Sequence, residues 1–257
     1  NYPIEKIQES SWRQIHPHPQ DVLIRWGSTL YPELDQRFQH IVNPIFFIKS
    51  NCRKDVMLQH ARNIIQAPRV YTRSQVMDRF FQQFPVLGRQ CYHTRGRDIK
   101  IVRNREEARH ARADYFVRYI RNQQEYRIHV IDGRIIRIQD KYLPNQEPTG
   151  IITRNYHLGW RFRDLPSSSF RENPREWEHL VKFSLTCYKY LDREAKLCIL
   201  PAEREGKKLL FMTAIDAVKN DQGLHFLEAN SAPYLSETGV IRYVQNISWF
   251  IEHAIAS

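Results

Sequence analysis

The sequence has few cysteines, and their spacing excludes two common kinds of cysteine-dependent structure. Only four of the 257 residues are cysteine, and no two of them form a C-x-x-C pair: Cys52, Cys91, Cys187 and Cys198. Neither a structural zinc site nor a framework of disulfide bonds is therefore indicated. Scattered free thiols fit a reducing compartment, so we expect an intracellular, cytoplasmic protein.

Long hydrophobic runs are also missing. The longest apolar stretch, residues 45–48, is far too short to span a bilayer. The first residues are polar and lack the apolar core of a signal peptide, and Asn1 rather than Met is expected of a trimmed or processed chain. Hydrophobic residues make up 42% of the chain and charged residues 26%, which is ordinary for a globular protein. We expect a soluble protein with no membrane partner.

Acidic residues are scarce relative to basic ones. The chain carries 28 Asp and Glu against 39 Lys and Arg, which gives a formal net charge of +11. Arginine is densest between Arg89 and Arg137. Because arginine binds phosphate and carboxylate groups in a bidentate manner, this density favours an anionic partner such as a nucleotide, an acidic peptide or a nucleic acid. A solvated basic face is the alternative explanation for most of these arginines taken singly.

Hydrophobic periodicity predicts an α+β protein. Apolar runs predict strands at residues 22–27, 84–89, 114–121, 125–131, 134–141, 209–218 and 224–230. Helical spacing predicts a helix over 53–65, a second that begins at Asn173-Pro174, and a third over 238–255. In the third helix, Ile241, Val244, Ile247 and Phe250 recur at this spacing. Asp132-Gly133 and residues 220–223 indicate two antiparallel hairpins, which argues against a parallel doubly wound fold in this half.

The second hairpin carries the side chains that predict chemistry. A turn centred near residue 221 places Asp216 opposite about position 227 on the partner strand. Glu228 and Asn230 lie two residues apart on that strand and therefore share a face. Three oxygen-bearing side chains on one face predict a magnesium site whose ion is bound together with substrate phosphates. The alternative is that Glu228 simply faces solvent on an edge strand.

The sequence around this hairpin resembles a known family. Residues 226–233, FLEANSAP, are similar to the LEvNssPg signature of ATP-grasp enzymes, and residues 236–240, SETGV, are similar to the segment that follows it in RimK-like glutamate ligases. The resemblance extends over residues 40–255 and is greatest to bacterial and phage members described as COOH–NH2 ligases. It implies an ATP-grasp fold, in which two α+β subdomains clasp ATP behind a short N-terminal α/β domain. The implied parts are residues 1–66 for the short domain, 67–120 for the small subdomain with the phosphate loop, and 121–257 for the large subdomain with the metal site.

The resemblance also implies roles for individual residues. Arg127 matches the arginine that helps to stabilise the reacting acyl phosphate, and Lys141 lies where the family has a phosphate-binding basic residue, so these two are the expected catalytic residues. Asp216, Glu228 and Asn230 are the expected ligands of two magnesium ions, with manganese as the alternative. The expected ATP-binding residues lie on the first phosphate strand, the glycine-rich loop, the hinge that pairs with adenine and an Arg/Asn segment: Arg89, His93, Thr94, Arg95, Gly96, Arg97, Arg118, Tyr119, Ile120 and Asn155.

The chain departs from the family pattern in four places. Arg89 stands where a lysine is usual, and the loop keeps one glycine, Gly96, with Asp98 where a second is common. Residues 192–208 replace the family's short approach to the first metal aspartate, which makes Asp216 the least secure of the three ligands. The N-terminal domain is short, so the acceptor pocket is expected to be incomplete or to be completed by a partner.

The activity implied by the resemblance is ATP-dependent ligation of a carboxylate to an amine. ATP phosphorylates the carboxylate, the amine attacks the acyl phosphate, and ADP and phosphate are released. The expected partners are an anionic carboxylate substrate and an amine acceptor, with an acidic peptide or protein favoured over a nucleic acid. One alternative is a catalytically degenerate ATP-grasp protein that binds nucleotide or nucleic acid. A plain nucleic-acid-binding module is another, because arginines and aromatic residues interleave at residues 115–119.

Overall fold

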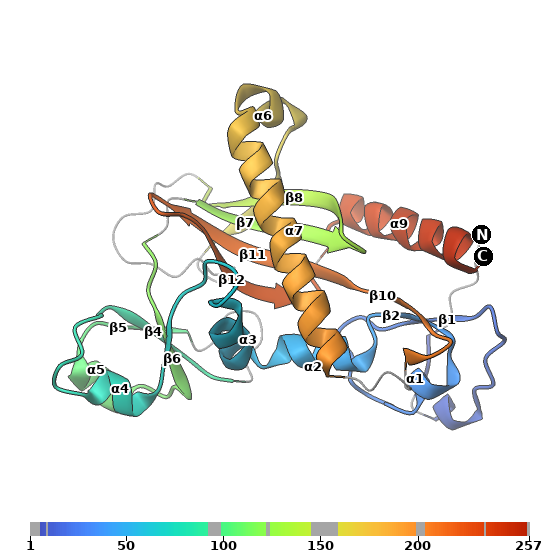
Figure 1. Cartoon of the computed structure of the whole chain (residues 1–257), viewed down its shortest axis with the longest axis horizontal. Coiled ribbons are helices and arrows are strands. Elements are labelled where there is room, and N and C mark those ends of the chain that lie inside the picture. The colour runs from blue at the N-terminus through green and yellow to red at the C-terminus, as the bar shows by residue number, and fades with distance from the viewer. Residues whose placement is uncertain are drawn as a thin grey trace.

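The chain forms three β-sheets that are joined by helices. The computed structural model describes residues 6–8, 10–91, 99–121, 124–144, 159–198, 204–233 and 235–255. Figure 1 shows the five-stranded sheet in the middle, the four-stranded sheet at one end and the three-stranded sheet at the other. Among the described residues, no helix is both long and apolar enough to cross a membrane.

The three-stranded sheet is parallel and belongs to the N-terminal part of the fold. Strand β2 (His40–Val42) lies between β1 (Val22–Ile24) and β10 (Lys208–Leu210). The short helices η1 (Trp12–Gln14) and α1 (Leu34–Arg37) accompany it. A small core of Leu23, Leu34, Phe38 and Ile41 holds the unit together. Its third strand comes from a segment about 170 residues away, and no local pattern in the sequence predicts this pairing.

The four-stranded sheet is antiparallel, with the strand order β3-β6-β4-β5. Its strands are β3 (Val70–Tyr71), β4 (Val86–Arg89), β5 (Lys100–Val102) and β6 (Tyr115–Arg118), and its helices are α4 (Arg73–Met77) and α5 (Arg105–His110). Both helices begin at side-chain caps, because Thr72 accepts a hydrogen bond from the Gln75 amide and Asn104 from the Glu107 amide. The predicted strands at 84–89 and 114–121 are confirmed here.

The five-stranded sheet contains both predicted hairpins. Its order is β12-β11-β7-β8-β9, all antiparallel, with β7 (Gln124–Ile131), β8 (Arg134–Tyr142), β9 (Arg161–Asp164), β11 (Met212–Asn220) and β12 (Gly223–Asn230). Asp132 and Gly133 turn the first hairpin with φ of 47° and 72°. Two positive φ values are those of a two-residue hairpin turn whose twist matches the strands, which confirms the prediction from Asp-Gly.

The two faces of the five-stranded sheet differ in kind. One face is apolar, and α7 (Pro174–Leu197) crosses it with α2 (Ile45–Cys52) and α3 (Lys54–Ala61) nearby (Figure 1). Tyr126, Ile128, Ile215 and Phe226 are buried in this main core. On β7 and β11 the alternate residues form the opposite face, and on β12 a register shift between Phe226 and Glu228 brings Glu228 and Asn230 to that face as well. The opposite face carries five of the predicted site residues: Arg127, Lys141, Asp216, Glu228 and Asn230.

The helices confirm part of the sequence-based prediction. Helix α7 begins at Pro174 with Asn173 as its N-cap, as predicted, and α6 (Ser167–Glu172) precedes it. The predicted helix at 53–65 is shorter, because α3 ends at Ala61, and α2 was not predicted at all. Helix α9 (Glu237–Ile255) buries Tyr243, Ile247 and Phe250, but Ile241 is 56% exposed and Val244 is 49% exposed. The opposite face of the helix packs against Ile131 and Met212, so Ile241 and Val244 lie on the outer side.

Candidate active site

A β-bulge aligns the two predicted carboxylate ligands more closely than the sequence suggested. From the turn, the β11–β12 pairs run in register from Asn220 opposite Gly223 to Ala217 opposite Phe226, and the register then shifts so that Asp216 lies opposite Glu228. The prediction that Asp216 lies opposite position 227 was wrong by one residue, because the bulge leaves Leu227 without a Cα partner. The shift places the two carboxylates on directly paired residues.

The structure brings the three predicted metal ligands together. The Asn230 Nδ2 atom lies 3.3 Å from Asp216 Oδ2 and 3.3 Å from Glu228 Oε1. Across the described part of the chain, no group of three or more Asp, Glu, His or Cys residues could hold a metal ion. Two carboxylates and one amide form a donor set of hard oxygens that fits magnesium, provided that substrate phosphate oxygens and water complete the coordination.

Glu228 is held by two cations from different elements. Its Oε2 atom lies 2.8 Å from Lys54 Nζ, at the start of α3, and 2.7 Å from Arg89 Nη2, at the end of β4. Burial alone would raise the pKa of Glu228, but the charges of Lys54 and Arg89 outweigh burial and hold it well below its usual range. The carboxylate is therefore ionised at every physiological pH, with both cations on Oε2 and the Asn230 amide beside Oε1.

Lys54 is the functional candidate that the sequence analysis missed. A single lysine at the start of a helix carries no signal by itself, and 174 residues separate it from Glu228. Its side chain is only 13% exposed, so it belongs to the cluster rather than to the surface. Only the packing of α3 against β12 brings the two together.

Arg127 and Asp216 form a bidentate pair across β7 and β11. Arg127 Nε and Nη2 each lie 2.7 Å from an Asp216 oxygen, and the two residues are partners in the strand register. The Phe162 ring of β9 covers the guanidinium, with 4.2 Å between the Arg127 Cζ atom and the ring centroid. Two parallel hydrogen bonds and a stacked ring fix the plane of this guanidinium.

Lys141, the other predicted catalytic residue, pairs with a different carboxylate. Lys141 Nζ lies 2.6 Å from Glu125 Oε1 and 5.1 Å from the centroid of the Phe162 ring. Glu125 is two residues from Arg127 on β7, so the two pairs share one face of the sheet. Lys141 therefore extends the charged cluster from β12 to β8.

The described cluster is nearly neutral and is fully paired within itself. Four cations, Lys54, Arg89, Arg127 and Lys141, face three carboxylates, Glu125, Asp216 and Glu228, which leaves a net charge of +1. Each carboxylate has a cation within 3 Å. When a charged ligand binds in such a site, it takes over the partner of a charged side chain, so that no buried charge remains without a counter-charge.

The other predicted ATP-binding residues fall into two groups: three lie at the end of β6, and six lie outside the described residues. Arg118, Tyr119 and Ile120 lie at the end of β6, where the Arg118 amide donates to the Arg69 carbonyl at 2.8 Å. Burial lowers the pKa of His225 on β12 and the charge of Arg118 lowers it further, which places this hinge within electrostatic range of the large sheet. The remaining candidates lie outside the described residues: His93, Thr94, Arg95, Gly96, Arg97 and Asn155.

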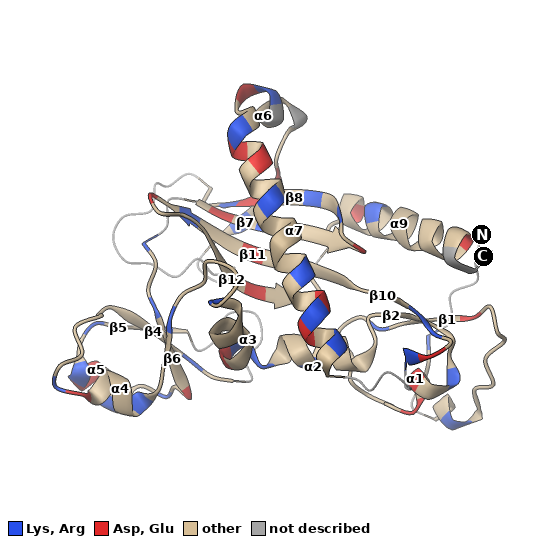
Figure 2. Ribbon diagram, in the orientation of Figure 1, with Lys and Arg blue, Asp and Glu red and all other residues tan. Residues whose placement is uncertain are grey.

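The arginines between positions 89 and 137 do not gather on one face. Figure 2 shows Lys and Arg distributed over all three sheets and most helices. Arg105 donates to the backbone carbonyls of Asp78 and Phe81, and Arg103 and Arg109 form exposed ion pairs on and beside α5. Of the described arginines in this stretch, Arg89 and Arg127 reach the charged cluster. The interpretation of the whole stretch as a phosphate site is therefore wrong for the part on α5.

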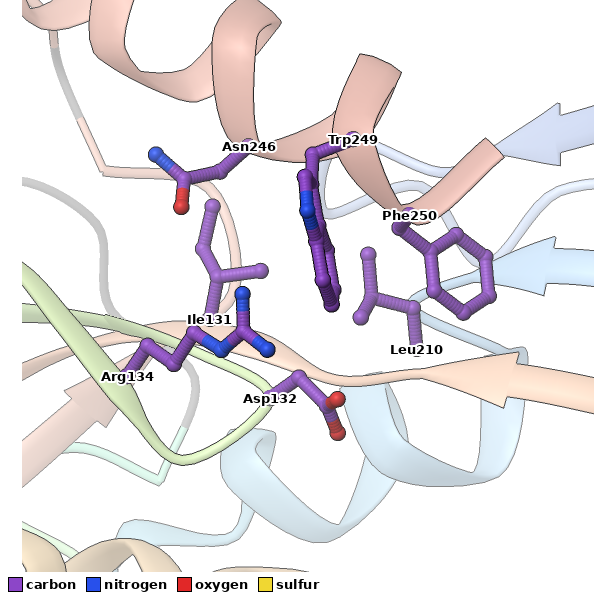
Figure 3. A pocket seen from close by; sticks show the side chains of 7 residues that line it. All are labelled: Ile131, Asp132, Arg134, Leu210, Asn246, Trp249 and Phe250. Carbon is purple, nitrogen blue, oxygen red and sulfur yellow. The ribbon is translucent and has the colours of Figure 1, made fainter. Parts of the chain in front are cut away.

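A shallow pocket lies elsewhere, between the β7–β8 turn and α9 (Figure 3). Arg134 Cζ lies 3.7 Å from the centroid of the Trp249 ring in this pocket, beside Asp132 and Asn246. None of the predicted site residues lines it. The pocket is a surface feature that is separate from the charged cluster.

Comparisons with known proteins identify the fold. No protein-family model matches the sequence, and no curated protein matches it. Solved structures do match. A D-alanine–D-alanine ligase from Bacillus anthracis, in complex with ATP, has a TM-score of 0.50 and 15% identity over 80% of this chain. The macrocyclase MdnC from Microcystis aeruginosa, bound to its precursor peptide MdnA, has a TM-score of 0.50 and 17% identity over 79% of the chain. A carboxyaminoimidazole ribonucleotide synthase from Aspergillus clavatus, in complex with ATP, has a TM-score of 0.52 and 12% identity over 83% of the chain.

These similarities concern the architecture. The chain has the ATP-grasp fold, as its sequence predicted, with mixed helices and sheets that match these structures over about 80% of its length. It spans 64%, 60% and 54% of the three matched chains respectively. Identities of 12–17% are too low to transfer an activity or a substrate, so both depend on the residues of this chain.

Proposed function

We propose that this protein is an ATP-dependent carboxylate–amine ligase of the RimK-like type. The observation that carries the proposal is the cluster of Asp216, Glu228 and Asn230 with Lys54, Arg89 and Arg127 on the polar face of an ATP-grasp sheet. Carboxylate and amide oxygens suit magnesium, and the cations suit the phosphates that accompany it. The SETGV segment that follows the metal strand supports the RimK-like type.

The proposed reaction is the transfer of a phosphoryl group followed by acyl transfer. A substrate carboxylate oxygen bonds to the γ-phosphorus of ATP as the bond to the β–γ bridging oxygen breaks, which gives an acyl phosphate and ADP. The amine nitrogen then bonds to the acyl carbon, inorganic phosphate leaves and the amine loses a proton. Magnesium, held by Asp216, Glu228 and Asn230, would neutralise phosphate charge.

The protein residues contribute position and charge. Lys54 and Arg89, which flank Glu228 in the ligand-free chain, are within reach of an anion that binds beside that carboxylate. Arg127 keeps its guanidinium plane fixed between Asp216 and Phe162, so it meets developing charge without a large reorganisation. Lys141 supplies a further positive charge on the same face.

The substrates that we propose are an anionic carboxylate and an amine acceptor, with an acidic peptide or protein as the favoured acceptor. The fold match to a macrocyclase bound to its precursor peptide makes a peptide substrate reasonable. The net charge of +11 favours an anionic partner. We propose a cytoplasmic location, which the four free cysteines, Cys52, Cys91, Cys187 and Cys198, support.

Product analysis tests the reaction. The protein, magnesium and ATP are incubated with a mixture of the twenty amino acids, tetraglutamate and tetraglycine, and the nucleotides are separated by chromatography. We expect ADP and phosphate in equal amounts, dependent on the added acids. AMP with pyrophosphate would refute the acyl-phosphate route. ATP binding without turnover on any acid would favour the alternative, a degenerate ATP-grasp protein that binds nucleotide.

A further inference from the structure

Beside Arg127, the same sheet face carries a second polar group that the proposed phosphate chemistry does not use. Gln139 on β8 is the direct cross-strand partner of Arg127 on β7. Directly paired residues of neighbouring strands have Cβ atoms about 4.5–5.5 Å apart, so both side chains can reach one ligand group. Gln139 is only 6% exposed, although nothing in the charged cluster requires a polar residue there.

Two successive buried hydrogen bonds, through His129 and Tyr243, fix the Gln139 carboxamide. Its Oε1 atom lies 3.0 Å from His129 Nε2, and His129 Nδ1 lies 2.9 Å from the Tyr243 hydroxyl of α9. The pKa of His129 is lowered to about 4, mainly by burial and also by the charges of Arg127 and Arg137, which outweigh the opposing effect of the hydrogen bond with Gln139, so the imidazole is neutral. A neutral imidazole that donates from Nε2 to Gln139 accepts at Nδ1 from Tyr243.

This arrangement leaves N–H donors of two neighbouring side chains, Gln139 and Arg127, without an acceptor among the described residues. Gln139 Oε1 is occupied by His129, and the Gln139 Nε2 atom has no hydrogen-bond partner in the part of the chain that the structure describes. Asp216 occupies Nε and Nη2 of Arg127, and within the same residues its Nη1 has no partner either. Neither nitrogen is among the described side-chain atoms that are fully buried without a partner, so both keep access to solvent and can donate to a ligand.

We propose that Arg127 Nη1 and Gln139 Nε2 together bind the carboxylate group of the substrate that is phosphorylated, and that His129 and Tyr243 position Gln139 for this task. The inference rests on the proposed ligase function and specifies the subsite of its acid substrate. A carboxylate only accepts hydrogen bonds, which matches two donors that have no acceptor of their own. The Gln139 amide remains a donor when the carboxylate becomes the acyl phosphate, since a carboxamide does not ionise at physiological pH.

A merely structural role explains this chain of residues less well. Filling the same space with apolar side chains would avoid burying three polar groups, and it would leave no amide nitrogen without a partner. Gln139 lies beside Arg127, whose guanidinium is held by Asp216 and Phe162. The hydrogen bonds through His129 and Tyr243 therefore position Gln139 next to a fixed cation.

The test measures activation of the acid separately from binding of ATP. Hydroxylamine replaces the amine, and hydroxamate is measured with Mg-ATP and the acid from the mixture of amino acids, tetraglutamate and tetraglycine that gives the highest rate. For Gln139→Met we expect the KM for that acid to rise about tenfold or more, as for a lost hydrogen bond to a charged group. The KM for ATP should stay within about twofold of the wild-type value. Gln139→Glu should lose more, because it sets a carboxylate against the substrate carboxylate.

Two further variants separate positioning from folding. Tyr243→Phe removes the hydroxyl that fixes His129, so we expect a smaller rise in the KM for the acid and again no change in the KM for ATP. Gln245→Met, at an exposed position of α9, is the matched control and should change neither KM. A structural role alone would lower thermal stability without separating the two KM values.

A readout that does not depend on turnover completes the test. In protein labelled with 15N-glutamine and saturated with Mg-ADP, the Gln139 side-chain amide signals, identified by their loss in Gln139→Glu, should shift as sodium acetate is added but not with equal sodium chloride. An unchanged KM for the acid in an active, folded Gln139→Met protein would overturn the inference and leave the ligase proposal standing. Absence of hydroxamate with wild-type protein on every acid would overturn the ligase proposal, and the inference would fall with it.

Discussion

Replacement of Glu228 by Gln is the most informative single perturbation of the charged cluster. The variant keeps the shape of the side chain and removes its charge, which in wild-type protein faces Lys54 at 2.8 Å and Arg89 at 2.7 Å. Activity should disappear at ordinary magnesium concentrations, because the neutral amide lacks the negative charge that would hold the ion. The structure adds a second expectation, since two mostly buried cations then lose their counter-charge.

The magnitude of the second effect follows from burial. Lys54 and Arg89 are 13% and 7% exposed, and removal of one partner from a buried ion pair costs about 3–5 kcal/mol. The Gln oxygen can still accept hydrogen bonds, so we expect a loss of about 3 kcal/mol in the free energy of unfolding. For a chain of this size, that corresponds to a decrease of about 6–12 °C in melting temperature.

The pH dependence has a definite sign. The pKa of Glu228 lies well below its ordinary value of 4.5 in the folded protein, because the two cations outweigh the effect of burial. A carboxyl group with a depressed pKa stabilises the fold fully above its unfolded pKa, and this stabilisation is lost as pH falls through the folded pKa. The stability difference between Glu228→Gln and wild type should therefore be full at pH 7 and pH 5.5 and should shrink below about pH 4.5.

Urea unfolding at several pH values and phosphate release as a function of magnesium measure the two effects. The double variant with Lys54→Met should be less destabilised than the sum of the single variants, because it removes one of the stranded charges, and it should remain inactive. Glu106→Gln, in an exposed pair with Arg109, is the matched control and should change stability by no more than about 0.5 kcal/mol. Retained turnover in Glu228→Gln, or a stability loss that persists at low pH, would refute the reasoning.

Three other variants test the remaining assignments. Arg127→Ala should lower kcat far more than it raises the KM for ATP, because in the proposed reaction the guanidinium meets the transferred group; steady-state kinetics measure this, and normal kcat with weak ATP binding would reassign Arg127 to ground-state binding. Lys54→Met should weaken the binding of Mg-ATP measured by calorimetry, and unchanged affinity would make Lys54 a structural partner of Glu228 only. Arg134→Ala removes the contact with Trp249 and should cost about 0.5–1 kcal/mol in urea unfolding with no change in turnover; a loss of activity would give the pocket of Figure 3 a functional role.

The sequence predicted those parts of the fold that depend on local patterns. Asp132-Gly133 identified a hairpin because a two-residue turn requires positive φ, and Asn173-Pro174 identified the start of α7 because Pro fits the first helical position. The spacing of Glu228 and Asn230 placed both on one face because the period of a strand is two residues. These rules involve only neighbours in the chain.

Features that depend on distant contacts could not be predicted in this way. Strand β10 joins β2 across about 170 residues, and Lys54 reaches Glu228 across 174. Ile241 and Val244 fit the helical spacing of α9, yet they are exposed because the burial of Tyr243 sets which side of the helix faces the sheet. The sequence places apolar residues around that helix, and only tertiary packing chooses the buried side.

The bulge at Leu227 shows how a small local irregularity sets the geometry of the candidate site. Without it, Asp216 would lie opposite Leu227, and Glu228 would be displaced by one residue. With it, Asp216 and Glu228 are paired, and Asn230 reaches both at 3.3 Å. A regular hairpin would therefore separate the two carboxylates that a shared ion requires.

Pairing of the cluster within itself has a consequence for how ligands bind. Every carboxylate that would hold magnesium already holds a cation, and every one of those cations would suit phosphate. Magnesium alone would add two positive charges to a cluster whose net charge is already +1, whereas ATP alone would compete with Glu228 and Asp216 for their cations. Each ligand removes the cost that the other meets, so binding of ATP and magnesium should be strongly coupled in both directions. The fold itself does not need either ligand, because the ion pairs already neutralise the carboxylates of the polar face.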